Sequence, residues 1–292
     1  MTSAPVSVVT GANSGIGRAT AIHLASVGHT VYGTVRSESR AEKLQAMAEA
    51  SGVNVALVEL DVADDDLVAS GFDEILRTAG RVDHLVNNAG VGGNAVVEEC
   101  PPSMFSEVMN INLNGPVRCS QAVLPQMRDR GSGTIVNVSS VVGRFGAVAQ
   151  APYTASKWAL EGMSEQLAHE LAPFGVRVAI IEPGVTKSAI FAKNVDAPNS
   201  SGVYDVQYRR MFQMYAAGIA HATDPFEVAA IIQHAIETDQ PSLRYAVSWA
   251  GPEIVAGRAE LSDEEWVALG AAADDSEYVE RFRAAFGVDI ST

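Results

Sequence analysis

Short apolar runs rich in β-branched residues alternate along the chain with longer segments that have a helical pattern. Each apolar run is too short for a buried helix, so seven strands are predicted: Val6–Thr10, Thr30–Val35, Val53–Leu60, Val82–Val86, Thr134–Val138, Val176–Ile181 and Leu243–Ser248. Helical segments are predicted at Gly15–Val27, Arg40–Ala50, Met104–Arg130 and Tyr153–Ala172. Strands that alternate with helices form parallel βαβ units with right-handed crossovers. The pattern therefore predicts an α/β fold, a single doubly wound Rossmann domain over residues 1–292 with helices on both faces of a parallel sheet.

Composition supports this interpretation and narrows the class of protein. The chain has 292 residues, of which 47% are hydrophobic and 19% charged, which suits one large domain with a full core. Cys100 and Cys119 lack CxxC spacing, as expected for reduced thiols in a cytosolic protein. No signal peptide is visible, and no apolar run reaches the ~18 residues needed to span a bilayer. We therefore expect a soluble, cytoplasmic protein with no membrane span.

The net charge of −15 argues against a nucleic acid partner, because phosphate binding draws on clustered Lys and Arg. Much of the acidic excess lies in residues 259–292, which hold nine acidic and two basic residues. A solvated acidic face is favoured there over a charged docking site.

This C-terminal extension is predicted to be helical. Ser262 and Glu265 form a capping box before a helix that holds Trp266. A second helix, which ends at Gly287, is indicated by three aromatic residues at i, i+4 and i+8: Tyr278, Phe282 and Phe286. Whether the extension covers the ligand cleft or a neighbouring subunit stays open.

Ligands in doubly wound sheets bind at the carboxyl ends of the strands. The first predicted strand ends in the turn Thr10–Gly17, with glycines at 11, 15 and 17. Glycines there permit close approach of a pyrophosphate to the backbone, and the helix N-terminus favours its negative charge. Glycine-rich turns between strand and helix also occur without a ligand.

The residues after the second strand bear on the choice of cofactor. A carboxylate at this point would bind the ribose hydroxyls of NAD, but the chain has Val35 followed by Arg36. A guanidinium suits a 2′-phosphate, to which Ser14 could add a hydroxyl, so NADP is favoured over NAD. The alternative for Arg36 is an ordinary solvated arginine. Asp61, after the third strand, is placed to reach the adenine amino group or to cap a turn.

Tyr153 and Lys157 are candidates for acid–base chemistry. They are four residues apart on a predicted helix and therefore share one face, and Ser140 precedes Tyr153 by thirteen residues. A phenol has a reference pKa near ~10, and a nearby ammonium lowers it toward the range of a proton-transfer catalyst. The alternatives are a surface i, i+4 pair and a serine that caps a strand.

Taken together, these residues resemble the short-chain dehydrogenase/reductase family. The resemblance covers about Val6 to Ser188 and depends on one ordered set: Thr10–Gly17, Asn87-Asn88-Ala89-Gly90, Asn112, Ser140, Tyr153, Lys157 and Pro183-Gly184. Within the family, the chain looks most like the hydroxysteroid 17β- and retinol-dehydrogenase branch. One departure is Ser188, where the family usually has threonine; Ser188 keeps the hydroxyl for the nicotinamide carboxamide.

The resemblance implies a role for each residue of a catalytic tetrad. Tyr153 would be the general acid or base, Lys157 would lower its pKa and bind the nicotinamide ribose, and Ser140, favoured over Ser139, would hold the substrate oxygen. Asn112, favoured over Asn110 and Asn114, would hold a water that links Lys157 to solvent. The implied NADP contacts are Gly11, Ser14, Gly15, Ile16, Gly17, Arg36, Asp61, Val62, Asn88, Ala89, Gly90, Tyr153, Lys157, Pro183, Gly184, Thr186 and Ser188.

Residues 187–222 are predicted to form a substrate lid within the domain, beginning with a mobile loop at Lys187–Gly202. An aromatic-rich helical face follows it, which indicates an apolar cleft or, alternatively, packing in the core: Tyr204, Tyr208, Met211 and Tyr215, with Phe212 and Met214 beside them. The opposite wall is expected to hold Phe145, Val148 and Ala149. The six histidines show no metal-ligand spacing, so no metal site is predicted.

The favoured function is an NADP(H)-dependent carbonyl reductase or alcohol dehydrogenase for a bulky hydrophobic substrate. One alternative is an NAD(H)-dependent dehydrogenase of a small ketone or sugar. Another is a dinucleotide-binding sensor without catalysis, although a sensor would not need Asn112, Ser140, Tyr153 and Lys157. The resemblance also implies a homodimer or homotetramer, with Met104–Arg130 and Tyr153–Ala172 as the expected interface.

Overall fold

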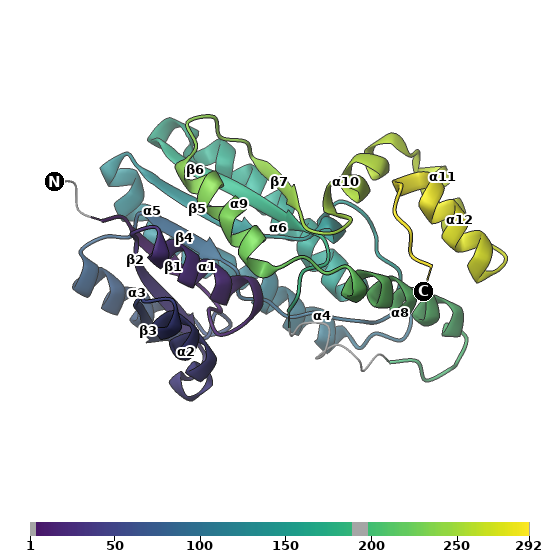
Figure 1. Cartoon of the computed structure of the whole chain (residues 1–292), viewed down its shortest axis with the longest axis horizontal. Helices are drawn as coiled ribbons and strands as arrows, with labels where there is room; N and C mark the ends of the chain where they lie inside the picture. Colours follow the sequence, from purple (N-terminus) through teal and green to yellow (C-terminus); the bar gives the residue numbers. More distant parts are fainter. Residues whose placement is uncertain (1–3, 189–197, 292) are drawn as a thin grey trace.

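The structure is a computed structural model that describes residues 4–188 and 198–291, and it contains one central parallel sheet (Figure 1). The sheet has seven strands in the order β3-β2-β1-β4-β5-β6-β7. Their bounds are β1 Val6–Val9, β2 Thr30–Val35, β3 Val55–Glu59, β4 His84–Asn87, β5 Gly133–Val138, β6 Val176–Pro183 and β7 Arg244–Val247. This order confirms the predicted doubly wound α/β fold, with the reversal of strand order between β1 and β4.

Helices connect the strands and extend beyond the last one. The α-helices are α1 Gly15–Ser26, α2 Glu42–Ala50, α3 Asp65–Ala79, α4 Pro102–Met109, α5 Gly115–Arg130, α6 Ala151–Leu171, α8 Asp205–Ala220, α9 Pro225–Glu237, α10 Gly251–Glu260, α11 Asp263–Gly270 and α12 Asp275–Phe286. Short 3₁₀ turns lie at Glu38–Arg40, Val141–Gly143 and Ala172–Phe174. None of the described helices is long and apolar enough to cross a membrane.

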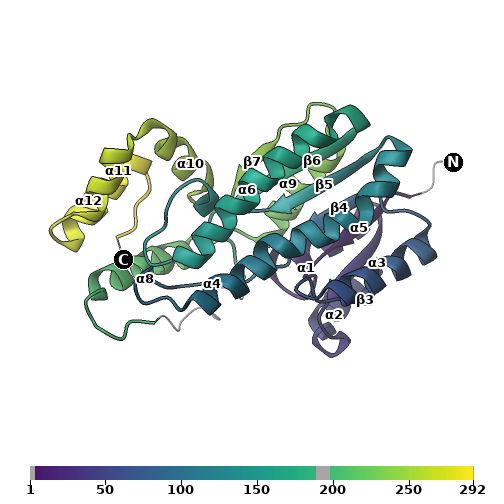
Figure 2. The ribbon, with the colours of Figure 1, turned by 180° about the vertical axis from the view of Figure 1, so that it is seen from behind.

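Two apolar cores lie on opposite faces of the sheet because successive strand residues point to opposite sides. Val8 and Leu85 pack with α3, α5 and the end of α6, whereas their neighbours Val9 and Val86 pack with α1, α2 and α9. Figure 1 shows α1 and α9 in front of the sheet, and Figure 2 shows α3, α5 and α6 covering it from behind.

The predicted helix Met104–Arg130 is not continuous. It is divided into α4 and α5 by a π-helical turn over Asn110–Asn114, where one turn is wider than in an α-helix. Helix α3 was not predicted, although Asp64 caps its N-terminus by accepting a hydrogen bond from Leu67 N at 2.9 Å. The helices α9 and α10 were not predicted either.

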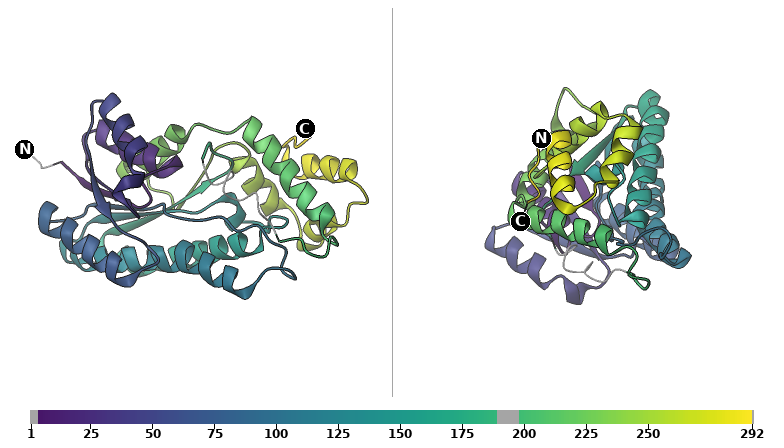
Figure 3. Two further views of the ribbon diagram at one scale, coloured as in Figure 1. Left: turned by 90° about the horizontal axis from the view of Figure 1, so that it is seen from below. Right: turned by 90° about the vertical axis from the view of Figure 1, so that its right-hand side faces the viewer.

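The C-terminal helices lie at one end of the molecule beside α8 (Figure 3). The predicted capping box of α11 is confirmed, since Glu265 N donates to Ser262 Oγ at 3.1 Å and Ser262 N donates to Glu265 Oε2 at 2.9 Å. Gly287 ends α12 with a φ of 67°, as predicted. A third core joins these helices to the segment after β5, with Phe145, Phe282 and Phe286 among its members.

Candidate active site

The glycines of the turn after β1 lie close to the end of β4. Gly11 has a φ of 67°, and a Cβ there would lie 2.9 Å from Ala89 Cα. A Cβ on Gly17 would lie 2.3 Å from Asn88 Nδ2, which donates to Thr10 O at 2.9 Å. The side chain of Asn88 therefore occupies the space beside Gly17 and ties the end of β4 to the turn. The missing side chains at Gly11 and Gly17 therefore permit close packing of the turn against the end of β4, and the N-terminus of α1 beside it favours a negatively charged group such as a pyrophosphate.

A continuous cavity of about 810 Å³ extends from this turn to the C-terminal helices. Of the expected cofactor-binding residues, those that line the cavity are Gly11, Ser14, Gly15, Ile16, Arg36, Asp61, Val62, Asn88, Ala89, Gly90, Tyr153, Lys157, Pro183, Gly184, Thr186 and Ser188. Gly17 is the exception, since it is buried beneath the turn. The fold thus gathers residues from five separate strand ends around one space.

The region of the cavity beside the end of β2 is basic. Arg36 directly follows β2, is exposed and lines the cavity together with Ser14. Arg40, which the sequence analysis did not single out, lines it as well. Asp61 also lines the cavity, and its Oδ1 accepts a hydrogen bond from Ala63 N at 3.0 Å. The carboxylate therefore stabilises a turn and faces the cavity at the same time.

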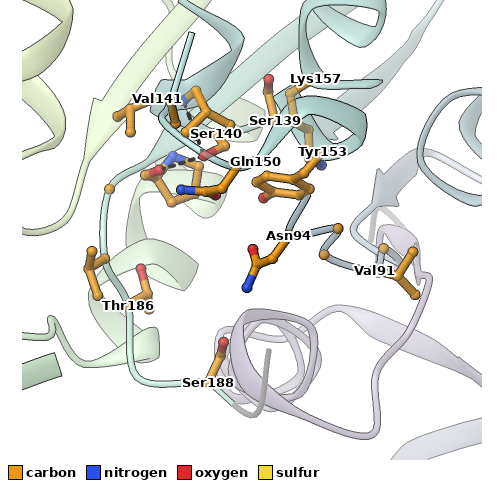
Figure 4. A pocket seen from close by; sticks show the side chains of 18 of the residues that line it. Val91, Asn94, Ser139, Ser140, Val141, Gln150, Tyr153, Lys157, Thr186 and Ser188 are labelled. Carbon is orange, nitrogen blue, oxygen red and sulfur yellow. Dashed lines mark hydrogen bonds between the residues drawn. The ribbon is translucent and has the colours of Figure 1, made fainter. Parts of the chain in front are cut away.

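Ser140 and Tyr153 lie close together in the middle of the cavity (Figure 4). Ser140 follows β5, and its Oγ accepts a hydrogen bond from Val142 N at 3.3 Å, so the start of the next turn fixes the side chain. Burial raises the pKa of Tyr153, and a hydrogen bond with the Ser140 side chain opposes this shift. The expected lowering of the Tyr153 pKa by Lys157 is therefore not observed, because the effect of burial dominates, and the phenol keeps its proton at neutral pH.

Lys157 lies one helical turn after Tyr153 on α6. Its Nζ is 5.7 Å from the centroid of the Tyr153 ring and donates a hydrogen bond to Val138 O at 2.9 Å. Burial lowers the pKa of Lys157 to about 8, while the negative charge of Glu161 acts in the opposite direction. The ammonium is thus close to the phenol, but its own charge is destabilised by burial.

Asn112 lies in the π-helical turn and is buried. Its Oδ1 accepts from Val91 N at 2.9 Å, and its Nδ2 donates to Val91 O at 2.9 Å and to Ser156 Oγ at 3.0 Å. The side chain therefore joins the loop after β4 to α6, the helix that carries Tyr153. The expected role in holding a water stays a prediction, and the observed contacts show a positioning role.

Two polar side chains near Tyr153 were not identified as site residues from the sequence. Asn94 and Gln150 are buried and line the cavity, and Figure 4 shows both beside Tyr153. The Tyr215 hydroxyl donates to Asn94 Oδ1 at 2.8 Å, and its pKa is raised by burial and by Tyr153. The hydroxyl of Tyr215 is therefore close enough to Tyr153 for its pKa to be affected. Only the Gly92-Gly93-Asn94 run after the Asn-Asn-Ala-Gly motif could have drawn attention to Asn94.

The predicted substrate face on α8 is correct only in part. Met211, Met214 and Tyr215 line the cavity, whereas Tyr204, Tyr208 and Phe212 do not. The Tyr208 hydroxyl accepts from Val96 N at 3.2 Å, so this ring belongs to the packing between α8 and the loop after β4. Residues 189–197 of the predicted lid lie outside the described residues.

The opposite wall and the C-terminal extension also contribute to the cavity. Phe145 and Val148 line it as predicted, but Ala149 packs against Tyr208 and Met211 instead. The C-terminal extension lies against the cavity, and its helices add an apolar wall. The wall residues are Trp266, Val267, Leu269, Gly270, Tyr278 and Phe282. Within the described residues there is no group of three His, Cys, Asp or Glu side chains that could hold a metal ion.

The arrangement has the parts needed for acid–base chemistry beside a bound dinucleotide. A hydroxyl pair and a buried ammonium lie between a glycine-lined cradle and an apolar wall. Ser140 and Tyr153 can both donate hydrogen bonds to one substrate oxygen, which stabilises negative charge that develops there.

Comparisons with known proteins agree with this geometry. Residues 5–199 match the short chain dehydrogenase family. Mouse 17-beta-hydroxysteroid dehydrogenase type 1 is 37% identical over 251 residues, which are 82% of this chain and 72% of the relative. The solved structure of a short-chain dehydrogenase from Streptomyces avermitilis has a TM-score of 0.81 at 36% identity and covers 93% of this chain and 100% of that one.

A metagenomic short-chain oxidoreductase solved in complex with NADP has a TM-score of 0.68 at 27% identity, covering 84% of this chain and 98% of its own. The matched range 5–199 contains the glycine-rich turn, Asn112, Ser140, Tyr153 and Lys157. The chain therefore belongs to the short-chain dehydrogenase/reductase family of oxidoreductases.

Proposed function

We propose that the protein is an NADP(H)-dependent oxidoreductase that interconverts a ketone or aldehyde and an alcohol on a bulky hydrophobic substrate. The observation that carries the proposal is the single cavity with three consecutive regions. Arg36 lies at its basic end, Ser140, Tyr153 and Lys157 lie in the middle, and the apolar C-terminal wall lies beyond them. This order places a reacting carbonyl between the cofactor cradle and a space for an apolar group.

The dinucleotide would be held by the glycine-rich turn, by Asn88–Gly90 after β4 and by the segment Pro183–Ser188 after β6. Bound NADP(H) supplies or accepts the hydride. During reduction, Ser140 donates a hydrogen bond to the carbonyl oxygen and Tyr153 transfers its phenolic proton to that oxygen. During oxidation, Tyr153 accepts the proton of the alcohol. The Lys157 ammonium stabilises the phenolate that exists between these steps.

Tyr153→Phe tests the chemical role because it removes the proton and leaves the ring. We expect kcat to fall by about 10²- to 10⁴-fold, the usual contribution of general acid–base catalysis. The measurement follows NADPH absorbance with a panel of bulky and small ketones, and parallel reactions use NADH. Undiminished turnover by the variant would exclude Tyr153 as the acid, and turnover of small ketones with NADH alone would favour the alternative dehydrogenase.

Arg36→Ala tests the choice of cofactor. A hydrogen bond to a charged group contributes about 1.5–3 kcal/mol, so NADPH binding should weaken by about tenfold or more while NADH binding stays nearly constant. Calorimetric titration of both cofactors measures the difference. Arg18→Ala is the matched control, since Arg18 lies near the turn on α1 but does not line the cavity. Equal losses for NADPH and NADH would exclude a contact between Arg36 and the 2′-phosphate.

A further inference from the structure

The far end of the cavity is built by two elements that are distant in the sequence. Helix α8 supplies Met211 and Met214, and the C-terminal helices supply Trp266, Leu269 and Phe282. The family match ends at residue 199, so neither element belongs to the part of the chain that it covers. The contact between α8 and the C-terminal helices therefore shapes the far end of the cavity, which membership of the family leaves open.

Arg210 makes that contact. Its side chain is buried, with the residue 3% exposed, although it carries a full charge. The guanidinium donates to Gly270 O at 3.2 Å, Ala272 O at 2.9 Å and Asp274 O at 3.3 Å, and its Nε is 3.3 Å from Asp275 Oδ1. These acceptors lie at the end of α11, in the connection and at the start of α12. A helix C-terminus leaves carbonyl groups without partners, and a cation stabilises them there.

The same guanidinium also fixes the side of the wall that faces the cavity. It lies 4.6 Å from the centroid of the Tyr278 ring, a cation–π distance, and both Arg210 and Tyr278 line the cavity. Phe282 is one turn further along α12 and lines the cavity as well. All three nitrogens of the guanidinium thus donate hydrogen bonds to the protein, which places Arg210 to hold the wall.

The position of Arg210 on α8 sets its distance from the chemistry. Tyr215, the electrostatic neighbour of Tyr153, is five residues further along the helix. At a rise of 1.5 Å per residue, the two positions are about 7.5 Å apart along α8. The Ser140–Tyr153 pair and the wall that Arg210 holds line one cavity, so a ketone with an apolar group beyond its carbonyl can contact both.

We propose that Arg210 is a specificity-determining residue, which positions the C-terminal wall so that it binds the apolar end of an elongated ketone or alcohol remote from the reacting carbon. This inference rests on the proposed function, because it assumes that the carbonyl lies at Ser140 and Tyr153. Other contacts keep the wall attached when Arg210 is lost. The ring of Phe145 packs edge-on against that of Trp266, with 5.6 Å between their centroids, and α10 packs against α12. Loss of Arg210 thus shifts the α11–α12 junction and does not remove the wall.

The test is Arg210→Met with two ketones, 4-phenylcyclohexanone and cyclohexanone. A group in a hydrophobic pocket changes the discrimination between two substrates by about tenfold or more. We therefore expect KM for 4-phenylcyclohexanone to rise by about tenfold and its kcat to stay unchanged. Both kcat and KM for cyclohexanone should stay unchanged. Arg210→Lys, which keeps the charge but loses the planar contacts, should give an intermediate KM. Arg209→Met is the control: Arg209 also pairs with Asp275, but its side chain is 57% exposed and does not line the cavity.

A binding measurement separates this inference from the proposed reaction. Trp266 lines the cavity, so its fluorescence reports the occupant of the far end, and Trp266→Phe identifies its signal. We expect 4-phenylcyclohexanone, with NADP⁺ present, to quench this fluorescence and to bind about tenfold more weakly to Arg210→Met. If no ketone is reduced but this difference holds, the proposed reaction fails and the role of Arg210 stands. If Arg210→Met affects both ketones equally, or neither, the role of Arg210 is wrong.

Discussion

Lys157 is buried in the wall of the cavity, where two effects on its pKa oppose each other. Burial lowers the pKa to about 8, and the charge of Glu161, one turn further along α6, raises it. Glu161 is itself part of an ion array, because its Oε2 accepts from Arg244 Nε at 2.9 Å. Glu182 belongs to the array as well, because its Oε1 is 3.0 Å from Arg144 Nη1 and 3.7 Å from Arg244 Nε. The array places a carboxylate beside Lys157, for which we propose an effect on Tyr153.

Glu161→Gln should therefore move the alkaline limit of activity to lower pH. Without the carboxylate the pKa of Lys157 falls further, so the ammonium loses its proton at a lower pH and ceases to stabilise the phenolate. The kcat–pH profile of both enzymes measures this shift. Glu165→Gln is the matched control, because Glu165 also binds Arg244, at 2.7 Å, but is exposed. A profile that does not move in Glu161→Gln would show that the array has only a structural role.

The structure brings Ser140, Tyr153 and Lys157 together, as expected from the sequence, because their relations are local or ordered; their chemical role stays a prediction. Tyr153 and Lys157 share a helix face at i, i+4, and Ser140 follows a strand whose end had to lie at the same edge of the sheet. Asn94 and Arg210 could not be found in this way. Each acquires its place from a partner far away in the chain, Tyr215 for Asn94 and the α11–α12 junction for Arg210.

At the scale of elements, strands were predicted more accurately than helices and their junctions. Parallel strands are buried on both faces, so each one appears in the sequence as an apolar run, and β2 was predicted with its observed bounds. The π-helical turn at Asn110–Asn114 has no such signal, since helical residues continue on both sides of it. It matters for the site because it directs Asn112 toward Val91 and Ser156.

For the C-terminal helices, the sequence predicted the helix ends but not the packing partners. Their starts and ends were predicted from caps, such as Ser262 for α11 and Gly287 for α12. Their docking beside α8 was not predicted, because the apolar face of a helix indicates that it is buried but not against what. The acidic residues that dominate this part of the sequence lie mostly on its outer side, while Trp266 and Phe282 face the cavity.

At the scale of the whole molecule, the predicted homodimer or homotetramer requires a surface through which two copies of the chain associate. The outer face of α6 offers one, since Ala155, Trp158 and Gly162 are exposed and Trp158 is 50% exposed despite its large apolar ring. A Cβ on Gly162 would meet nothing within 4 Å in the single chain. Small residues let two helices approach closely, and a two-fold axis would bring this face against its own copy. The face is therefore suited to self-association through α6.

Gly162→Glu tests this interface without disturbing the single chain. The new side chain has open space in the monomer, so the circular dichroism spectrum should stay that of the wild type, but in a closely packed pair two carboxylates would be forced together. Light scattering at physiological ionic strength, where the repulsion between copies of charge −15 is screened, should show a dimer or tetramer for the wild type and a smaller mass for the variant. Met47→Glu, an exposed position on α2 at the other face of the sheet, should leave the mass unchanged. A monomeric wild type would contradict the predicted oligomer, and an unchanged mass for Gly162→Glu would place the interface elsewhere.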